Sequence, residues 1–230
     1  MELFGLEKLS LVDYDGKVAC TVFTGTCNFC CGFCHNAPLV KDFKNLPVIS
    51  EEEVFEYLNK RKGIIEGVCV SGGEPTLQKD LPMFLERLKN LGLSVKLDTN
   101  GTNPTLIKEL FTNGLVDYFA MDIKNNKEDY AEIIGVKGFN TKKVENSVEF
   151  FLTNKVDFEL RTTLIKEYHK EENIEKIGAW IKGTKKYFLQ KFKLSENCIS
   201  QNLNGVEEEK AKEFIEILKN YNINAKLRGY

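Results

Sequence analysis

The sequence lacks the long apolar runs, the charge excess and the linker segments that mark membrane proteins, nucleic-acid binders and multidomain chains. No apolar run approaches the roughly 20 residues of a membrane-spanning helix, and the first residues carry no basic stretch ahead of an apolar core, so we expect neither a membrane span nor a secretion signal. The 32 basic and 34 acidic residues nearly cancel, which argues against a whole-surface attraction to nucleic acid. With no proline-rich linker and no low-complexity stretch, residues 1–230 are expected to form a single cytoplasmic domain.

Cysteine is unevenly placed. Four of the seven cysteines fall within eight residues: Cys27, Cys30, Cys31 and Cys34. The other three are scattered and are expected to be ordinary thiols. A disulfide framework would be spread more evenly, and in a reducing compartment a cysteine cluster more often holds a metal or an iron-sulfur cluster.

The spacing within this group favours an iron-sulfur cluster. Cys27, Cys31 and Cys34 are separated by three and then two residues, so that three thiolates on one loop can hold a [4Fe-4S] cluster and leave one iron open to another ligand. Cys30 offers a competing spacing, as a fourth ligand or as a zinc ligand. A structural zinc site, however, usually joins two separated ligand pairs, and the second pair is missing.

Short apolar runs alternate with segments of helical periodicity. The turn dipeptide Asp15-Gly16 predicts a β-hairpin or successive strands formed by residues 9–12 and 18–24. Further strands are predicted near residues 67–73, 94–101, 117–124, 157–164 and 186–193, with a possible last strand at 225–229. About six βα units are too few for a complete eight-stranded barrel, so we expect an α/β fold with a mostly parallel sheet: an open partial (β/α)6 TIM-like barrel with an N-terminal hairpin.

Two glycines end the strand predicted at residues 67–73, and a carboxylate follows them. Gly72 and Gly73 would let the backbone approach a ligand closely, and Glu74 would place a carboxylate beside it, an arrangement that suits an amino-bearing ligand. A turn containing Gly-Gly and Pro is also a common structural feature, and that alternative stays open.

Polar residues lie at the ends of the next two predicted strands, and one lies within the strand after them. They are Asp98, Asn100, Asp122, Lys124 and Arg161. Charges are costly to bury unless they are paired or bound, so these side chains are candidates for contacts with a zwitterionic ligand. The alternatives are helix caps for the first two and structural ion pairs for the others.

The chain has two histidines. His35 directly follows the last cysteine of the group and would either hydrogen-bond near the cluster or pack the loop. His169 lies in a polar stretch and is expected to be solvated. Neither is predicted to act as a general base.

These motifs resemble the radical SAM superfamily. Cys27, Cys31 and Cys34 match its cluster motif, and the run from Gly72 to Pro75 matches its glycine-rich motif for S-adenosylmethionine (SAM). The resemblance implies one radical SAM domain over residues 1–230. The run Cys34-His35-Asn36, with the later DTNG and DIK segments, is similar to the glycyl-radical activating enzymes and most similar to the activating protein of anaerobic ribonucleoside-triphosphate reductase.

The resemblance implies a mechanism. SAM would bind the open iron through its amino and carboxylate groups, with the backbone of residues 72–74 and Glu74 near the amine, and the polar strand-end residues would make its remaining contacts. An electron from ferredoxin or flavodoxin would cleave SAM to methionine and a 5′-deoxyadenosyl radical, which would take a hydrogen atom from a glycine of a partner reductase.

Two alternatives stay open. One is a radical SAM enzyme that acts on a small molecule, such as 7-carboxy-7-deazaguanine synthase. The other is an iron-sulfur electron carrier without SAM chemistry, which would not need polar residues at the strand ends.

Overall fold

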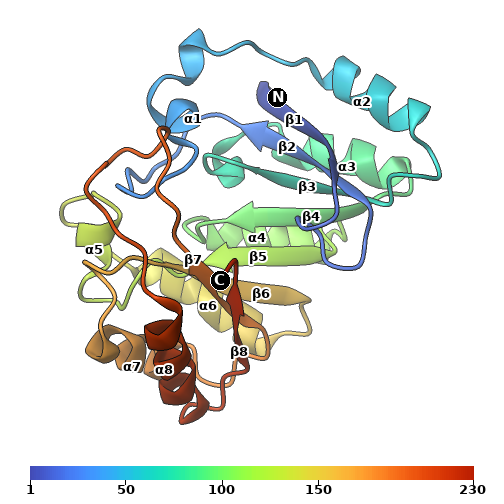
Figure 1. Ribbon diagram of the computed structural model, residues 1–230. Coiled ribbons are helices and arrows are strands. Elements are labelled where there is room, and N and C mark those ends of the chain that lie inside the picture. Colours follow the sequence, from blue (N-terminus) through green and yellow to red (C-terminus); the bar gives the residue numbers. More distant parts are fainter. The chain divides into compact units, whose positions relative to one another are not determined.

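The strands of the sheet follow one another in chain order. In the computed structural model, which describes residues 1–230, one sheet has the order β1-β2-β3-β4-β5-β6-β7-β8 (Figure 1). The strands are β1 (Leu3–Ser10), β2 (Ala19–Thr24), β3 (Gly67–Gly72), β4 (Ser94–Thr99), β5 (Tyr118–Asp122), β6 (Phe158–Leu164), β7 (Tyr187–Lys191) and β8 (Ala225–Arg228).

Helices occupy most of the connections between strands. They are α1 (Ala37–Lys41), α2 (Glu51–Lys60), α3 (Leu81–Asn90), α4 (Pro104–Thr112), α5 (Tyr130–Ile133), α6 (Lys142–Thr153), α7 (Glu171–Trp180) and α8 (Glu208–Lys219), with the short 3₁₀ turns η1 (Phe43–Asn45) and η2 (Pro75–Leu77). From β2 to α8 this order gives six βα units, followed by β8. The predicted fold class, a mostly parallel α/β sheet with an N-terminal hairpin, is confirmed.

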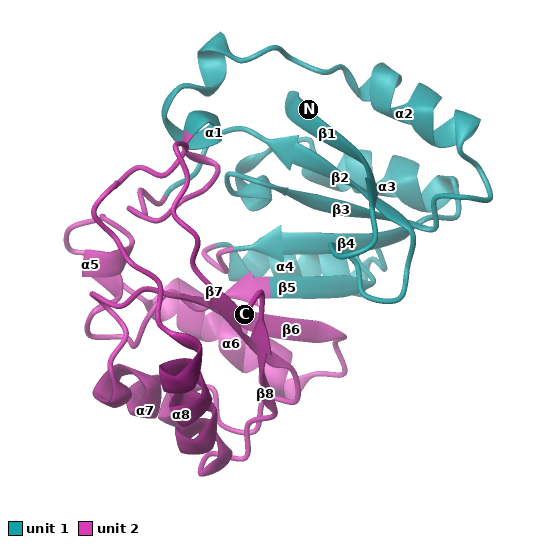
Figure 2. Cartoon of the chain, viewed as in Figure 1, with its two compact units in different colours: residues 1–28, 38–99, 103–120 teal, residues 29–37, 100–102, 121–230 magenta.

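The chain divides into two compact units, shown in two colours in Figure 2. The first unit holds residues 1–28, 38–99 and 103–120, and the second holds residues 29–37, 100–102 and 121–230. Because the chain passes between them several times, neither unit is one continuous stretch of sequence. The single domain expected from the sequence remains a prediction.

In the first unit, β1 is antiparallel to β2, whereas β2, β3 and β4 run parallel. Most residues of β2, β3 and β4 are buried, and α3 packs against β4, whereas β1 is largely exposed or half-buried. The N-terminus of α2 is fixed by a capping box, in which the Ser50 side chain accepts from the Glu53 amide and the Glu53 carboxylate accepts from the Ser50 amide. Since parallel strands share a direction, the carboxyl ends Thr24, Gly72 and Thr99 lie along one edge.

In the second unit, β6, β7 and β8 run parallel, and α7 packs on α8, which also contacts β8. Its core holds large aromatic side chains that are almost completely buried, such as Tyr130, Tyr187, Phe151 and Phe214. Of the polar residues described below, Asp122 ends β5 (Tyr118–Asp122), Lys124 follows it, and Arg161 lies within β6.

The first predicted strand was placed wrongly. The structure begins β1 at Leu3 and ends it at Ser10, whose hydroxyl accepts from the amides of Val12 and Asp13 and so turns the chain. Val12 is 80% exposed, so the apolar alternation at residues 9–12 continues past the end of the strand. The turn at Gly16 (φ +76°) and the last strand, β8, are confirmed. No helix is long and apolar enough to cross a membrane.

Candidate functional site

The loop between β2 and the cysteine group has a strained backbone conformation. Thr26 has φ +64°, which is unusual for a β-branched residue. Its amide donates to the Leu39 carbonyl at 2.8 Å, and the Gln78 amide group donates to the Gly25 carbonyl at 2.9 Å. These contacts hold the backbone directly before Cys27, which is half-buried.

The two glycines after β3 allow a close backbone approach to this loop. The Gly73 amide donates to the Thr24 carbonyl at 2.9 Å, and the Glu74 amide donates to the Thr26 carbonyl at 2.8 Å. A Cβ atom on Gly72 (φ +123°) would lie 2.3 Å from the Thr24 oxygen, and one on Gly73 would lie 1.8 Å from the Thr26 oxygen. Only glycine fits at both positions, so the Gly-Gly segment and the approach to Cys27 form one joined surface.

Glu74 is a buried carboxylate with several donors. Its Oε1 atom accepts from the Thr76 amide at 3.1 Å, from the Thr76 hydroxyl at 2.5 Å and from the Thr99 hydroxyl at 2.7 Å. Because Thr99 ends β4, these bonds join the loop after β3 to the end of the neighbouring strand. Glu74 therefore also fixes the shape of the Gly-Gly loop.

Asp98 lies over a buried lysine. The Lys96 ammonium is 2.7 Å from Asp98 Oδ1, and the Ser71 hydroxyl donates to Oδ2 at 3.2 Å. Lys96 pairs with Cys69 across the β3–β4 register, and its ammonium is 3.8 Å from the Cys69 sulfur. Sequence reasoning missed Lys96, although a charged residue inside the apolar run of β4 was a signal for it.

Asn100 does not cap a helix. Its side-chain oxygen accepts from the Thr102 amide at 3.0 Å and the Thr102 hydroxyl at 2.7 Å, which fixes a turn around Gly101 (φ +76°). The N-cap of α4 is Asn103, whose side chain accepts from the Leu106 amide. The alternative of a helix cap at Asp98 or Asn100 is therefore wrong.

The remaining cysteines of the group lie in a loop anchored through its backbone. The Cys30 amide donates to the Ile134 carbonyl at 2.8 Å, the Cys34 amide to the Cys31 carbonyl at 3.0 Å, and the Ser200 amide to the Gly32 carbonyl at 2.8 Å. Cys31 is buried, Cys34 is half-buried and Cys30 is exposed. Burial raises the pKa of the Cys34 thiol. No disulfide joins any of the seven cysteines, so their sulfur atoms keep the chemistry that iron-sulfur clusters bind.

Asp122, Lys124 and Arg161 form one ionic group. Asp122 Oδ1 accepts from Arg161 Nε at 2.9 Å, and Oδ2 accepts from the Lys124 ammonium at 2.9 Å. Desolvation lowers the pKa of Lys124, but the Asp122 carboxylate and the Cys31 thiolate outweigh it, and the net pKa is raised. The structural ion pairs that the sequence left open as an alternative are present, the ligand contacts remain a prediction, and these three side chains together carry one excess positive charge.

Lys124 also connects this ionic group to the cysteine loop. Its ammonium lies 5.5 Å from the centre of the Phe33 ring, and Phe33 is buried between Cys31 and Cys34 in sequence. The second unit thus places a charged ammonium beside two of the predicted cluster ligands.

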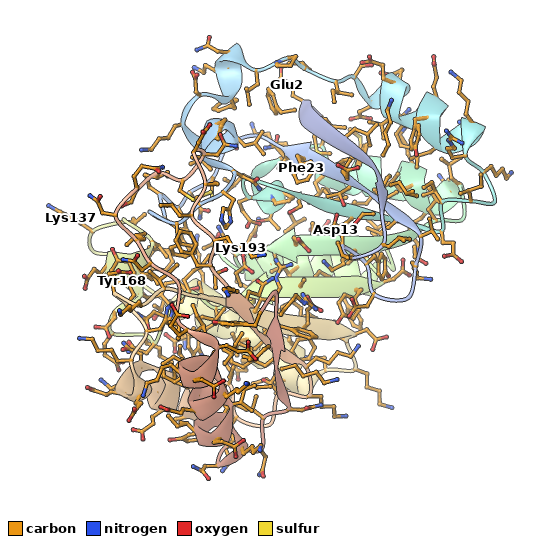
Figure 3. The ribbon with its side chains drawn as sticks, in the orientation of Figure 1. Glu2, Asp13, Phe23, Lys137, Tyr168 and Lys193 are labelled. Carbon is orange, nitrogen blue, oxygen red and sulfur yellow. The ribbon has the colours of Figure 1, made fainter.

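The histidines differ from expectation. His35 stacks on Phe192 at 5.5 Å between ring centres, and its Nε2 lies 2.6 Å from the Lys193 carbonyl, so it packs the loop. His169 was predicted to be solvated, and this is wrong, because it is 2% exposed. Figure 3 labels the residue before it, Tyr168, in the loop after β6. The partners of His169 are the backbone of Ile165, four residues before it, and the backbone of Lys124, 45 residues before it.

The predicted site residues are shared between the units. The first unit contains Cys27, Gly72, Gly73, Glu74 and Asp98, and the second contains Cys31, Cys34, Asn100, Asp122, Lys124 and Arg161. In the second unit the contacts above bring Asp122, Lys124 and Arg161 together, while the contacts described for Asn100 are with Thr102.

Comparisons with known proteins agree with these motifs. The model of the family described as the Radical SAM superfamily matches residues 21–181. A Methanocaldococcus jannaschii protein, named as a candidate glycyl-radical enzyme activating enzyme, is 35% identical over 192 residues, which cover 82% of this chain and 78% of that protein.

Two solved structures share the fold. Streptococcus suis SuiB bound to S-adenosylmethionine aligns with a TM-score of 0.68 and 16% identity over 90% of this chain, which spans about half of SuiB (49%). A domain of the pyruvate-formate lyase-activating enzyme from Bacteroides vulgatus aligns with a TM-score of 0.56 and 20% identity, covering 71% of this chain and 99% of that domain.

Proposed function

The chain belongs to the radical SAM superfamily, and on this premise we propose that it is an activating enzyme that generates a glycyl radical on a partner enzyme. The observation that carries the proposal is the 35% identity, over 82% of the chain, to a protein named for that activity. We propose anaerobic ribonucleoside-triphosphate reductase as the partner, because Cys34-His35-Asn36 and the DTNG and DIK segments are most similar to its activating protein.

Cys27, Cys31 and Cys34 would hold the [4Fe-4S] cluster. Thiolates are its usual protein ligands, and three of them leave one iron for SAM. The two ligands in the second unit lie on a loop whose backbone is held by hydrogen bonds at Cys30, Gly32 and Cys34. The exposed Cys30 is not a ligand in this proposal. When bound, the cluster would supply the electron that cleaves SAM to methionine and a 5′-deoxyadenosyl radical.

Two groups of residues would orient the methionine end of SAM. The backbone of Gly72 to Glu74 would face the amine, because the glycines keep that backbone free of side chains. The excess positive charge around Lys124 and Arg161 suits the carboxylate. Asp98 and Asn100, held in fixed orientations by Lys96 and Thr102, would make further polar contacts.

The chain's own contribution is binding, orientation and exclusion of water. Buried Phe29 and Phe33 flank Cys30 and Cys31 and keep this part of the loop apolar. A reactive radical needs enclosed surroundings, since stray hydrogen-atom donors would quench it. Ferredoxin or flavodoxin would supply the electron.

The test is transfer of the radical to a partner. The anaerobically reconstituted protein, reduced flavodoxin and SAM are mixed with the anaerobic reductase from the same source, and the glycyl-radical doublet is recorded by electron paramagnetic resonance. The doublet should form with the wild type and with Cys30→Ala, and not with Cys31→Ala. SAM cleavage without a doublet on the reductase would overturn this partner and favour another glycyl-radical enzyme or a small-molecule substrate, as in 7-carboxy-7-deazaguanine synthase.

A further inference from the structure

We propose that His169 is a positioning residue for Lys124: through a hydrogen bond to the Lys124 carbonyl, it sets where the ammonium stands beside the cysteine loop and so controls the binding of SAM. The inference rests on the proposed function, because it assigns Lys124 a role in holding the SAM carboxylate. Nothing in the sequence around His169 pointed to it.

The hydrogen bonds fix the state of the imidazole ring. The Ile165 amide donates to His169 Nδ1 at 2.9 Å, so this nitrogen carries no proton. Nε2 lies 2.9 Å from the Lys124 carbonyl, which can only accept, so Nε2 carries the proton and donates. One neutral ring therefore joins the loop after β6 to the residue that follows β5 by two positions.

Ile123, the residue before Lys124, is held by two other hydrogen bonds. The Ile123 amide donates to the Arg161 carbonyl at 2.8 Å, and the Thr162 hydroxyl donates to the Ile123 carbonyl at 2.6 Å. These bonds end at Ile123. The Lys124 amide donates to the Tyr130 hydroxyl at 3.4 Å, and for the Lys124 carbonyl the donor is His169. Loss of the His169 bond would therefore loosen the backbone on the carbonyl side of Lys124.

A displaced Lys124 backbone would move its ammonium. At present the ammonium is 2.9 Å from Asp122 and 5.5 Å from the centre of the Phe33 ring. Charge-assisted hydrogen bonds weaken steeply with distance and angle, so a small shift would weaken recognition of an anionic ligand. The ring keeps its role at neutral pH because burial lowers the pKa of His169 to about 4.

Two near-isosteric variants separate the two bonds. His169→Asn keeps an acceptor near the position of Nδ1 for the Ile165 amide and loses the donor to Lys124. His169→Gln can place an amide nitrogen near the position of Nε2 and keep that donor. The control is Thr184→Val, which removes a buried hydrogen bond from Thr184 to the Ile181 carbonyl (2.6 Å) elsewhere in the second unit.

Two measurements are made on each protein. The first is the dissociation constant of SAM for the reconstituted, cluster-loaded protein. We expect His169→Asn to weaken binding roughly three- to tenfold, the worth of one buried hydrogen bond, and His169→Gln and Thr184→Val to stay within about twofold of the wild type. The second is hydrogen exchange of the amides of residues 123–126 in the cluster-free protein, which should speed up only in His169→Asn.

Each outcome decides. Equal SAM affinity and equal exchange in His169→Asn and His169→Gln would overturn the proposal. An affinity loss that Thr184→Val shares would show that it follows general stability, and would also overturn it. If the wild type binds SAM but activates no partner, the proposed function is wrong and the role of His169 is unaffected. If the wild type binds no SAM, the claim that His169 controls SAM binding is refuted, and the exchange data decide whether His169 positions Lys124.

Discussion

Replacing Gly73 by alanine tests the close approach on which the first unit's part of the site depends. The added Cβ atom would lie 1.8 Å from the Thr26 oxygen and 2.6 Å from the Thr26 carbon, distances that real structures do not tolerate. Both neighbours are backbone, so no side chain can swing away. The loop after β3 must therefore separate from the loop after β2.

The expected cost follows from what this separation breaks. The bonds from the Gly73 amide to Thr24 (2.9 Å) and from the Glu74 amide to Thr26 (2.8 Å) would both be lost, at about 1 kcal/mol each. Overpacking at a rigid site costs about 1–3 kcal/mol more. We expect Gly73→Ala to lower the free energy of unfolding by about 3–5 kcal/mol.

Urea denaturation followed by circular dichroism measures this loss. Gly16→Ala is the matched control, since Gly16 has φ +76° and open space around it, so its alanine carries only the backbone cost of about 1 kcal/mol. The Gly73 variant should also bind less iron after reconstitution, because Cys27 follows Thr26. If Gly73→Ala lost no more stability than Gly16→Ala, the close approach would not exist in solution.

Three further predictions follow from other contacts. Lys96→Met would leave the Asp98 carboxylate without its buried ammonium and should lower the free energy of unfolding in urea by about 3–5 kcal/mol. The double variant with Asp98→Asn should recover part of this loss, and no recovery would refute the pairing. Because burial lowers the pKa of His169 to about 4 from 6.5, the unfolded chain takes up its proton first, so stability should fall by about 2 kcal/mol between pH 7 and pH 5, and His169→Gln should lack this part of the slope. Cys30→Ser should retain the iron and sulfide content of the wild type, and loss of a quarter or more of the iron would make Cys30 a ligand.

Local patterns revealed much of the fold. Apolar runs of strand length alternating with helical periodicity predicted the βα order, and the Ser50 and Glu53 pair predicted the start of α2. These signals lie within one element each. The first strand was misplaced because the alternation at residues 9–12 continued past Ser10, where a side-chain hydrogen bond, not hydrophobicity, ends the strand.

The parts of the candidate site that lie in short sequence motifs were predicted. The parts that depend on contacts between residues distant in sequence were missed. The cysteine spacing and the Gly-Gly-Glu run are readable in sequence. His169 and Lys124, which share a hydrogen bond, are 45 residues apart in the sequence, and no periodicity links them. Lys96 was readable in principle, because a buried charge in a strand requires a counter-charge, but its partner Asp98 was predicted to be a ligand contact or a helix cap.

The most direct test of the central claim is chromatographic detection of 5′-deoxyadenosine. The protein is reconstituted anaerobically with iron and sulfide, reduced with dithionite and given SAM, without and then with its partner enzyme, and Cys31→Ala and Cys30→Ala are treated alongside. We predict 5′-deoxyadenosine and methionine from the wild type and from Cys30→Ala, and none from Cys31→Ala. Absence of 5′-deoxyadenosine from a wild type that holds a full [4Fe-4S] cluster, with its partner enzyme present, would contradict the account.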